Sequence, residues 1–594
     1  MNDILSQLNP AQQEAVSHRE GPMLILAGAG SGKTRALTYR VAYLMAEKKV
    51  KPENILLLTF TNKAAKEMKE RVKKLVGSVP PFAGTFHSFG ARILRMDGEN
   101  LGLPSHFSIF DENDQEEVVK KAIEEIGLSP KKFNPRSVLS TISQAKNELI
   151  SALEYPSLAR GYFQETVARV FLIYQKLLKE QEALDFDDLL VETVRLFQKH
   201  PEVLGKYQNR FQWILVDEWQ DTNRAQYLLT KLLVSRFRNL CVVGDASQSI
   251  YAFRGADFRN ITNLQKDFPD IKIYNLEQNY RSTQTILDAA YEVIRHNHSH
   301  PILKLWTQNQ PGEKIGLYQA RSELDEAQFI VRTIKNYLSS SDFKLNHFAV
   351  LYRTNAQSRS IEEAFLHEGL PYTLVGGVRF YSRKEIKDVL SYLRLIANPK
   401  DAVSSGRIAK LGKRRLEKFL RLTPKLTPTI ATIEILDKIL AETDYLELYN
   451  NQDPQDLARL ENIKELRSVA TQFPDLITFL ENVALVEKET LHYGPSQNAV
   501  TLMTAHAAKG LEFPVVFIVG MEEGLFPHSR SFFEPLEIEE ERRLCYVGMT
   551  RAKQKLYFSF ASRRLYFGQS SQNLVSRFLA EIPESFLESV TIKE

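Results

Sequence analysis

Short apolar runs that end in glycine-rich or polar clusters recur along the first half of the chain. Residues 23–26 form one such run, and "AGAGSGKT" follows it, with helical spacing from Thr34 through Leu44 behind. Residues 213–216 form another, and Asp217 and Glu218 come directly after it. Short apolar runs bounded by turn signals are typical of buried strands. The pattern predicts a doubly wound parallel sheet with its site at the carboxyl ends of the strands.

Two further predicted strands also end in polar residues, in "LLLTFTNKAAKEM" and in "LCVVGDASQSIYAFRGA". In the first, Thr61 or Asn62 is expected to cap the helix that follows. Residues 108–200 instead show helical spacing, and the apolar positions of one such helix are Val119, Ala122, Ile123 and Ile126. The first half is therefore expected to combine a motor-like sheet with a helical insertion.

Composition places the chain among ordinary globular proteins without indicating a partner. The 594 residues predict roughly 3–5 domains. With 77 basic and 73 acidic side chains the net charge is only +4, so any polyanion must be met by local patches. Two cysteines give no disulfide framework. Because neither a signal-like start nor a long uncharged apolar segment is found, we expect a soluble, cytoplasmic protein without membrane contact.

The stretch "AGAGSGKT" has the chemistry of a phosphate-binding loop. Glycines at 28, 30 and 32 let backbone N–H groups converge on phosphate oxygens at a helix N-terminus. Lys33 is expected to reach the β- and γ-phosphates, and Thr34 to ligate Mg²⁺. A glycine-rich turn with a chance Gly-Lys-Thr is the alternative. The strand, loop and helix order favours the phosphate site.

The acidic pair after residues 213–216 is the natural second half of such a site. Asp217 is expected to hold Mg²⁺, directly or through water, and Glu218 to orient and deprotonate the attacking water. A strand end with a solvated acidic pair is the alternative, and the upstream phosphate loop argues against it. Together these residues predict a nucleotide-dependent motor or switch.

Ordered motifs extend over almost the whole chain. They are "AGAGSGKT", "TFTNKAAKEM", "TFHS", "VDEWQDT", "VGDASQSIYAFRGA", "LEQNYRS", "VGGVRFYSRKE", "VTLMTAHAAKGLEF" and "YVGMTRA". In this order they resemble the motifs of superfamily-one DNA helicases of the UvrD/PcrA/Rep type. The resemblance implies an α/β fold with two RecA-like parallel-sheet motor domains, each carrying a mostly helical insertion, and ATP with Mg²⁺ bound in the cleft between the two motor domains.

The same resemblance assigns nucleotide contacts. Gln12 would read the adenine edge, Tyr280 would stack on the base, and Glu512 would contact the ribose or phosphate end. Arg35 would lie near the nucleotide. The phosphate-loop residues that complete this set are Ala29, Gly30, Ser31, Gly32, Lys33 and Thr34.

Three further residues are assigned to the γ-phosphate by resemblance. Gln248 would sense it, and Arg281 and Arg551 are the candidate arginine fingers. An arginine supplied by a moving domain makes hydrolysis depend on domain closure. Without the other motifs, a surface salt bridge would be the better explanation of either arginine.

Single-stranded DNA is the implied partner, together with single-strand/duplex junctions and proteins of repair or replication. Aromatic stacking and a basic or polar track hold single strands. The residues expected to stack on bases or lie beside them are Phe60, Phe186, Tyr251, Phe253 and Arg254. Those expected to contact the backbone are Thr85, His87, Arg353 and Asn355. Each aromatic residue has a core position as its alternative, and the histidines at 296, 298 and 300 are expected to lie on a solvated helix end.

The resemblance also sets domain boundaries. The first motor domain is expected at 1–107 and 201–280 with its insertion at 108–200, and the second at 281–390 and 499–594 with its insertion at 391–498. That second insertion is shorter than the family's and lacks its Pro-x-Arg-Gly-Ile-Gly signature. Whether the shortening is natural or engineered stays open, with "SSG" at 404–406 as a candidate linker. Its basic residues, Lys410, Lys413, Arg414, Arg415 and Lys418, either contact duplex DNA or form a solvated face.

Two functions follow. The first is an ATP-dependent helicase that moves 3′ to 5′ on single-stranded DNA and unwinds duplex, with a role in repair or replication restart. The alternative is a DNA-stimulated translocase that displaces proteins but separates strands weakly. A nucleotide-gated binding protein without turnover is disfavoured, because the expected catalytic side chains are present.

Overall fold

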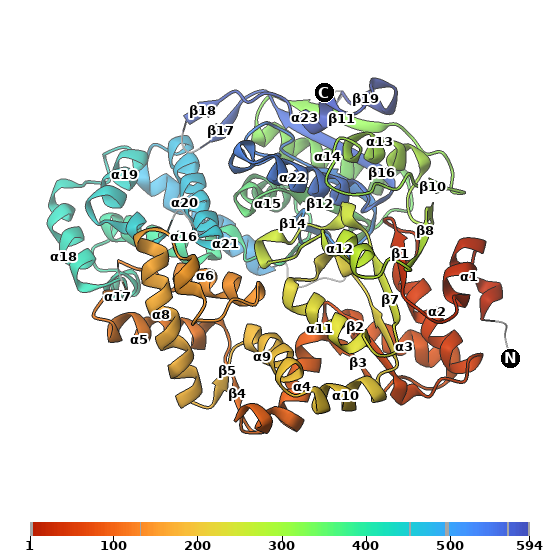
Figure 1. Ribbon diagram of the computed structural model, residues 1–594. Coiled ribbons are helices and arrows are strands. Elements are labelled where there is room, and N and C mark those ends of the chain that lie inside the picture. Colours follow the sequence, from red (N-terminus) through yellow and green to blue (C-terminus); the bar gives the residue numbers. More distant parts are fainter. Residues whose placement is uncertain (1–3, 131, 451–452, 493–497, 567–568, 592–594) are drawn as a thin grey trace. The chain divides into compact units, whose positions relative to one another are not determined.

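The chain folds into two compact units (Figure 1). The structure is a computed structural model that describes residues 4–130, 132–450, 453–492, 498–566 and 569–591, without the side chains of residues 254, 454, 485–492, 566 and 569. Unit 1 consists of Met1–Tyr280 and His298–Gln308, and unit 2 of Arg281–Asn297 and Asn309–Glu594. Each unit is built around its own parallel sheet.

Unit 1 contains a six-stranded sheet in the order β3-β2-β6-β7-β1-β8, with every neighbouring pair parallel. The strands are β1 (Met23–Ala27), β2 (Ile55–Thr59), β3 (Phe82–Thr85), β6 (Trp213–Val216), β7 (Asn239–Gly244) and β8 (Lys272–Leu276). The chain leaves β1 toward β2 on one side of the sheet and leaves β7 toward β8 on the other side. Doubly wound sheets bind ligands at the carboxyl ends of the strands where the connections diverge in this way.

Helices cover both faces of this sheet because successive side chains of a strand point to opposite sides. Ile25 and Leu57 pack on one face, against α1 (Pro10–Ser17), α2 (Lys33–Ala46) and α3 (Asn62–Val76). Leu24 and Leu56 pack on the other. The helices of that second face are α4 (Phe86–Asp97), α9 (Phe186–Lys199), α10 (Pro201–Arg210), α11 (Arg224–Val234) and α12 (Asn260–Asp267). Apolar burial on both faces explains the near-continuous apolar runs in the sequence.

The helical insertion of unit 1 has a separate core. Its elements are β4 (Ser108–Ile109), α5 (Glu112–Glu125), α6 (Pro135–Asn147), α7 (Tyr155–Leu158), α8 (Gly161–Glu180) and β5 (Ala183–Leu184). Val119 and Phe171 lie at the centre of this core, and the helices group together in Figure 1. Helix α9, which falls within the predicted insertion, packs mainly on α4 and α11 of the motor domain, and its start also contacts α6.

Unit 2 contains a seven-stranded parallel sheet in the order β13-β14-β12-β15-β16-β11-β19. Its strands are β11 (Ile315–Ala320), β12 (Phe348–Tyr352), β13 (Tyr372–Val375), β14 (Val500–Thr504), β15 (Phe513–Ile518), β16 (Ala552–Ala561) and β19 (Leu587–Ser589). Helices that pack beside it include α13 (Gln284–Ile294), α14 (Glu323–Ser340), α15 (Ser358–His367) and α22 (Pro535–Met549). Two parallel sheets confirm the predicted α/β fold class.

The second insertion shares one continuous core with this sheet. Its helices are α16 (Lys384–Ala397), α17 (Ala402–Lys410), α18 (Lys413–Leu422), α19 (Thr432–Glu442), α20 (Pro454–Gln472) and α21 (Leu476–His492). Leu436 and Leu466 belong to the same buried cluster as Val350. Residues 404–406, considered above as a linker, lie inside α17, where Ser404 is buried.

One short segment, residues 298–308, lies in a different unit from the one that the sequence predicts. Residues 298–308, which the sequence counted with the second motor domain, belong to unit 1. There β10 (Trp306–Thr307) pairs with β9 (Gln278–Asn279), and Leu305 packs against the phosphate loop at Gly28. The segment also corrects the expectation of a solvated histidine cluster. His300 is buried, pairs with Ser247 at 3.1 Å and packs edge-on against Phe258, whereas His296 and His298 are exposed.

Candidate functional site

The phosphate loop between β1 and α2 has a backbone that depends on glycine. Gly30 and Gly32 have φ angles of 66° and 85°, a region that side chains with a Cβ rarely adopt. Gly32 is also the N-cap of α2, so the loop delivers the positive end of the helix dipole to its concave side.

Hydrogen bonds from the surrounding protein fix the loop through its carbonyl groups. Asn279 Nδ2 donates to the Ala29 carbonyl at 2.6 Å, the Tyr280 N–H donates to Gly30 at 3.0 Å, and Gln12 Nε2 donates to Ser31 at 3.0 Å. The loop is thus held in shape by residues from two distant segments of unit 1. Sequence reasoning missed Asn279, although it lies inside the quoted "LEQNYRS" motif.

Lys33 is the clearest sign that the loop receives an anion. Its Nζ is buried and makes no hydrogen bond within the part of the chain that the structure describes. A buried ammonium group without a partner is costly, and a phosphate oxygen is the partner that the loop geometry offers. The residues present therefore fit the predicted nucleotide.

Asp217 and Glu218 lie where β6 ends, beside Lys33 and Thr34. The Thr34 hydroxyl donates to Asp217 Oδ2 at 3.2 Å. Burial, together with the negative charge of Glu218, raises the pKa of Asp217 to about 7, although Lys33 acts in the opposite direction. A divalent cation would stabilise the charged form of this carboxylate, so the donor set of Thr34 and Asp217 fits Mg²⁺.

Glu218 has an unusual backbone for a residue with a side chain. Its φ is 51°, in the left-handed region, and Gln220 Nε2 donates to its carboxylate. Such strain persists only where the surrounding structure imposes it, and it recurs at active sites. Gln220 also accepts from the backbone N–H of Asp245 at 2.9 Å, and Asp245 in turn accepts from Gln248 Nε2 at 2.6 Å. Gln220 and Asp245, which sequence reasoning did not single out, therefore join Glu218 to the predicted γ-phosphate sensor.

The predicted base-binding residues surround the start of α2. Asn9 Nδ2 donates to the Tyr280 hydroxyl at 2.7 Å, and the Tyr280 side chain is half exposed, as a stacking surface must be. Arg35 donates to the Gln7 carbonyl at 2.6 Å and lies over the Tyr39 ring.

Unit 2 brings the other predicted nucleotide residues together. Arg281 Nε donates to Glu512 at 2.7 Å, and Lys553 Nζ contacts the same carboxylate at 2.7 Å. Although burial acts to raise it, Lys553 and Arg281 hold the pKa of Glu512 below its usual value. Arg551 is buried and donates to the carbonyl groups of Val547 and Leu511 at 2.9 and 3.2 Å. The two candidate fingers therefore differ, since Arg281 pairs with a carboxylate, whereas Arg551 donates to carbonyl groups and to the Thr550 hydroxyl.

The predicted stacking residues form an aromatic row in unit 1. The rings of Phe60 and Tyr251 lie parallel with centroids 6.0 Å apart, and Phe253 meets Tyr251 edge-on at 6.1 Å. Phe253 is 55% exposed, which argues against its core alternative. The side chain of Arg254 lies outside the described residues.

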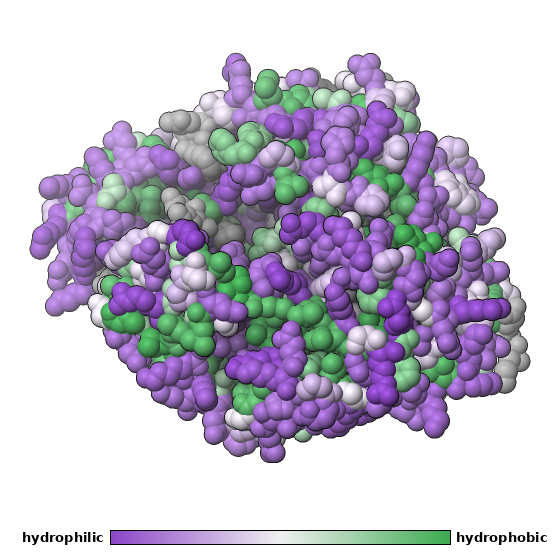
Figure 2. Space-filling view, viewed as in Figure 1, coloured by the Kyte–Doolittle hydropathy of each residue, from purple (hydrophilic) through white to green (hydrophobic). Residues whose placement is uncertain are grey.

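A second aromatic pair joins the motor sheet to the end of the helical insertion. His87 and Phe186 meet edge-on at 6.1 Å, and the Phe186 side chain is 50% exposed. Burial lowers the pKa of His87, so its ring is neutral at pH 7 and offers a hydrogen bond, not a charge. Thr85 caps α4 by accepting from the Ser88 N–H. Figure 2 shows hydrophobic patches over the region of α8 and α9 on an otherwise mostly hydrophilic face.

Of the predicted DNA residues of unit 2, Arg353 has a protein partner. Arg353 binds Glu541 in a bidentate pair, with nitrogen to oxygen distances of 2.7–2.9 Å. Asn355 begins a short 3₁₀ turn, Asn355–Gln357. In the basic run, Arg414 and Lys418 both contact Asp444, whereas Lys410 and Lys413 are exposed. The run is therefore only partly available to a further partner.

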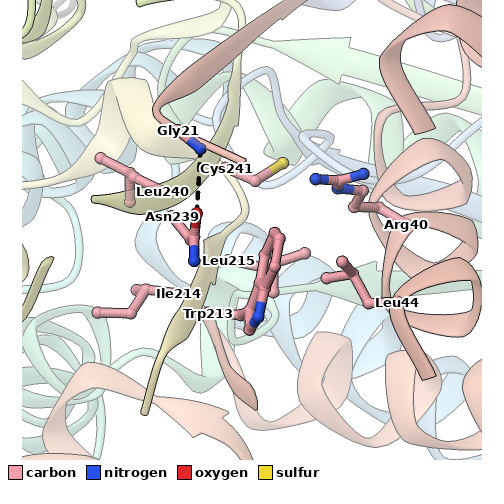
Figure 3. Close-up of a pocket in the computed structure, with 9 residues that line it drawn as sticks. All are labelled: Gly21, Arg40, Leu44, Trp213, Ile214, Leu215, Asn239, Leu240 and Cys241. Atoms are coloured by element: carbon pink, nitrogen blue, oxygen red, sulfur yellow. Dashed lines mark hydrogen bonds between the residues drawn. The ribbon is translucent and has the colours of Figure 1, made fainter. Parts of the chain in front are cut away.

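A small hollow at the amino-terminal ends of the central strands of unit 1 is not a competing site. It lies where β6 and β7 begin, beside Trp213 and Asn239, and the Gly21 N–H closes one side by donating to Asn239 (Figure 3). It has essentially no room for a molecule the size of water, whereas small-molecule sites enclose roughly 300–1,000 Å³. Arg40 there donates to the carbonyl groups of Val16 and Arg19, which is a structural role.

The described residues contain neither a membrane-spanning helix nor a metal-binding cluster. Among the described residues, no helix is long and apolar enough to cross a membrane. Within the same ranges, no group of three or more histidine, cysteine or acidic residues has the geometry of a metal site.

Comparisons with known proteins agree with the geometry. The family described as UvrD/REP helicase N-terminal domain matches residues 8–269, and the UvrD-like helicase C-terminal domain matches 274–443 and 425–563. The protein named ATP-dependent DNA helicase PcrA of Bacillus subtilis is 48% identical, over 100% of this chain and 88% of the relative. PcrA of Staphylococcus aureus (strain Mu50) is 47% identical, over 99% and 88%. The first alignment spans 651 positions, more than this chain's 594 residues, so the relative contains residues without a counterpart here. The chain belongs to the UvrD/REP helicase family and is of the UvrD/PcrA type.

Proposed function

We propose that the protein is an ATP-dependent DNA helicase that moves 3′ to 5′ along single-stranded DNA and unwinds duplex. The observation that carries the nucleotide part is Lys33, whose buried ammonium group makes no hydrogen bond within the described residues. The DNA part rests on the aromatic row and on relatives named as DNA helicases. The direction, the cytoplasmic location and a role in repair or replication restart rest on the family resemblance.

In the proposed mechanism, each side chain at the carboxyl ends of β1, β6 and β7 has one task. Lys33 binds phosphate oxygens, and Thr34 and Asp217 would hold Mg²⁺, which would neutralise phosphate charge. Glu218 orients the attacking water and takes its proton. Gln248, held by Asp245, lies within the same hydrogen-bonded set and senses whether the γ-phosphate is present.

The proposed direction has a direct test that does not require unwinding. Single-stranded oligonucleotides with streptavidin bound at one biotinylated end report which way a motor moves. We expect ATP to speed displacement from the 5′ end and to leave displacement from the 3′ end at the spontaneous rate. Faster displacement from the 3′ end would reject the proposed direction.

Two features favour the alternative, a translocase with weak strand separation. The B. subtilis relative contains residues that this chain lacks, and we propose that they belong to the short second insertion. Two of the basic side chains there are also occupied by Asp444. ATP hydrolysis and streptavidin displacement without unwinding would establish this alternative.

Phe253→Ala tests the affinity of the protein for single-stranded DNA. Replacing it by alanine removes a stacking surface worth roughly 1–3 kcal/mol per base, so the affinity for single-stranded DNA should fall about tenfold to a hundredfold. ATP hydrolysis at saturating DNA should persist while translocation slows. Fluorescence anisotropy with labelled oligothymidine measures the affinity, and stopped-flow translocation assays measure the speed.

Phe237→Ala is the matched control for this prediction. Phe237 is 38% exposed and lies just before the amino-terminal end of β7, whereas the aromatic row follows the carboxyl ends of β2 and β7. Its loss should leave the affinity unchanged. Equal affinities for the parent and Phe253→Ala would mean that Phe253 does not hold DNA.

A further inference from the structure

The C-terminal end of α6 contacts the segment that carries the catalytic carboxylates. Asn147, the last residue of α6, accepts a hydrogen bond from Asn223 Nδ2 through its Oδ1. Asn223 is the N-cap of α11 and directly follows the loop of residues 217–222 that contains Glu218. The helical insertion thus contacts the residue that follows the ATPase loop through a pair of amide side chains, beside the ion pair of Arg224 and Glu148.

The same side chain reaches the DNA-facing end of the insertion. Asn147 and Ser143 both lie near the carboxylate of Asp187, which directly follows Phe186, and Asn147 Nδ2 donates to Ser143 Oγ at 3.4 Å. The neighbouring Lys146 is fully buried, with its Nζ 2.6 Å from Asp185 and 2.7 Å from Asp188. Because Asp185 also caps α9, these contacts bind the start of α9 tightly to the end of α6. Asn147 therefore lies at the junction between the end of α6 and the first turn of α9, which carries Phe186.

Asn147 also packs against the turn that follows Phe253. A Cβ added at Gly255, whose φ is 81°, would lie 3.3 Å from the Asn147 Cβ. Two residues later, the Asp257 N–H donates to the Thr222 carbonyl of the Glu218 loop at 3.0 Å. Three segments with separate tasks, two for DNA and one for ATP, therefore meet at one side chain.

We propose that Asn147 is a positioning residue that couples single-stranded DNA at Phe186 and Phe253 to the Glu218 loop, so that DNA accelerates ATP hydrolysis. The proposal rests on the proposed function, since it needs a DNA-stimulated ATPase. Bases that stack on Phe186 or Phe253 shift α9 or the Gly255 turn, and the Asn147–Asn223 hydrogen bond passes that shift to the loop. The coupling needs only a difference in loop geometry between the free and the DNA-bound protein.

Two substitutions break this link without removing the groups that bind ATP or stack on bases. Asn147→Ala deletes both amide contacts. Asn223→Asp keeps the oxygen that caps α11 at the Gln226 N–H, 2.9 Å away, but replaces the donor that faces Asn147 with an acceptor. We expect each to lower the stimulation of ATPase by oligothymidine about two- to tenfold, the range that one hydrogen bond covers. The rate without DNA, the affinity for oligothymidine and the melting temperature should stay near parent values.

The double variant and a control substitution on α6 distinguish loss of coupling from a general loss of stability in this region. Asn147→Ala combined with Asn223→Asp should be no worse than Asn147→Ala alone, because the bond that Asn223→Asp breaks is already absent in Asn147→Ala. Gln144→Ala, at an exposed position one turn earlier on α6, should behave as the parent does.

Three results would overturn the inference. They are full stimulation in Asn147→Ala, additive losses in the double variant, and losses of stimulation that match losses of DNA affinity or melting temperature. If oligothymidine did not stimulate the ATPase of the parent protein, the proposed function itself would be rejected. That outcome is distinguishable from failure of the inference, because it is measured on the parent protein without any variant.

Discussion

Glu218→Gln should abolish ATP hydrolysis while leaving nucleotide binding intact. The substitution keeps the shape of the side chain and its contact with Gln220, but an amide cannot take a proton from the attacking water. Loss of a general base costs about 10²–10⁴ in rate. Steady-state phosphate release and the affinity for a fluorescent ATP analogue, measured on the same preparation, test both halves of this expectation.

Lys33→Ala provides the contrast. Because the Lys33 ammonium group is the phosphate ligand in this account, its removal should lower both hydrolysis and analogue affinity. Hydrolysis at the parent rate by Glu218→Gln would show that another group is the base. A shared loss of binding in both variants would show that Glu218 shapes the nucleotide site and does no chemistry.

Arg281→Ala is expected to lower turnover by about 10³ or more, the scale of an arginine finger. In the structure, Arg281 is held by Glu512 and by the Thr550 carbonyl, so the guanidinium group is positioned near the loop that also carries Glu512. Single-stranded DNA affinity should change little, because the aromatic row belongs to the other unit. Single-turnover hydrolysis and anisotropy measure the two quantities.

Arg281→Lys is the matched variant, since it keeps the charge but loses the planar fork that contacts two oxygens at once. It should recover only part of the lost rate. Arg551→Ala is expected to lower turnover to a similar extent. Because Arg551 is buried against the carbonyl groups of Val547 and Leu511, a melting curve must accompany it. Equal losses of DNA affinity and hydrolysis would instead make these arginines structural.

Local patterns in the sequence predicted the framework of unit 1 well. Residues 213–216 were expected as a strand and form β6, and Thr61, one of two candidates, caps α3 by accepting from the Ala64 N–H. These features depend on spacing and capping within a few residues, so they can be read without tertiary information.

Contacts between distant segments could not be predicted in the same way. The pair of Arg353 and Glu541 joins residues 188 positions apart. His300 stands in a polar run that reads as solvated, yet the return of residues 298–308 to unit 1 buries it against Ser247. Nothing in the spacing of α16 to α21 indicated that the second insertion shares a core with the sheet. The roles of the site residues remain predictions that the variants above test.

Strand separation on two matched substrates tests the central claim most directly. A duplex with a 3′ single-stranded tail and one with a 5′ tail, identical in sequence and length, are each incubated with the protein and Mg²⁺, with and without ATP. The account predicts ATP-dependent separation of the 3′-tailed duplex only, and none by Glu218→Gln. Failure to separate the 3′-tailed duplex, or equal separation of the 5′-tailed one, would contradict it.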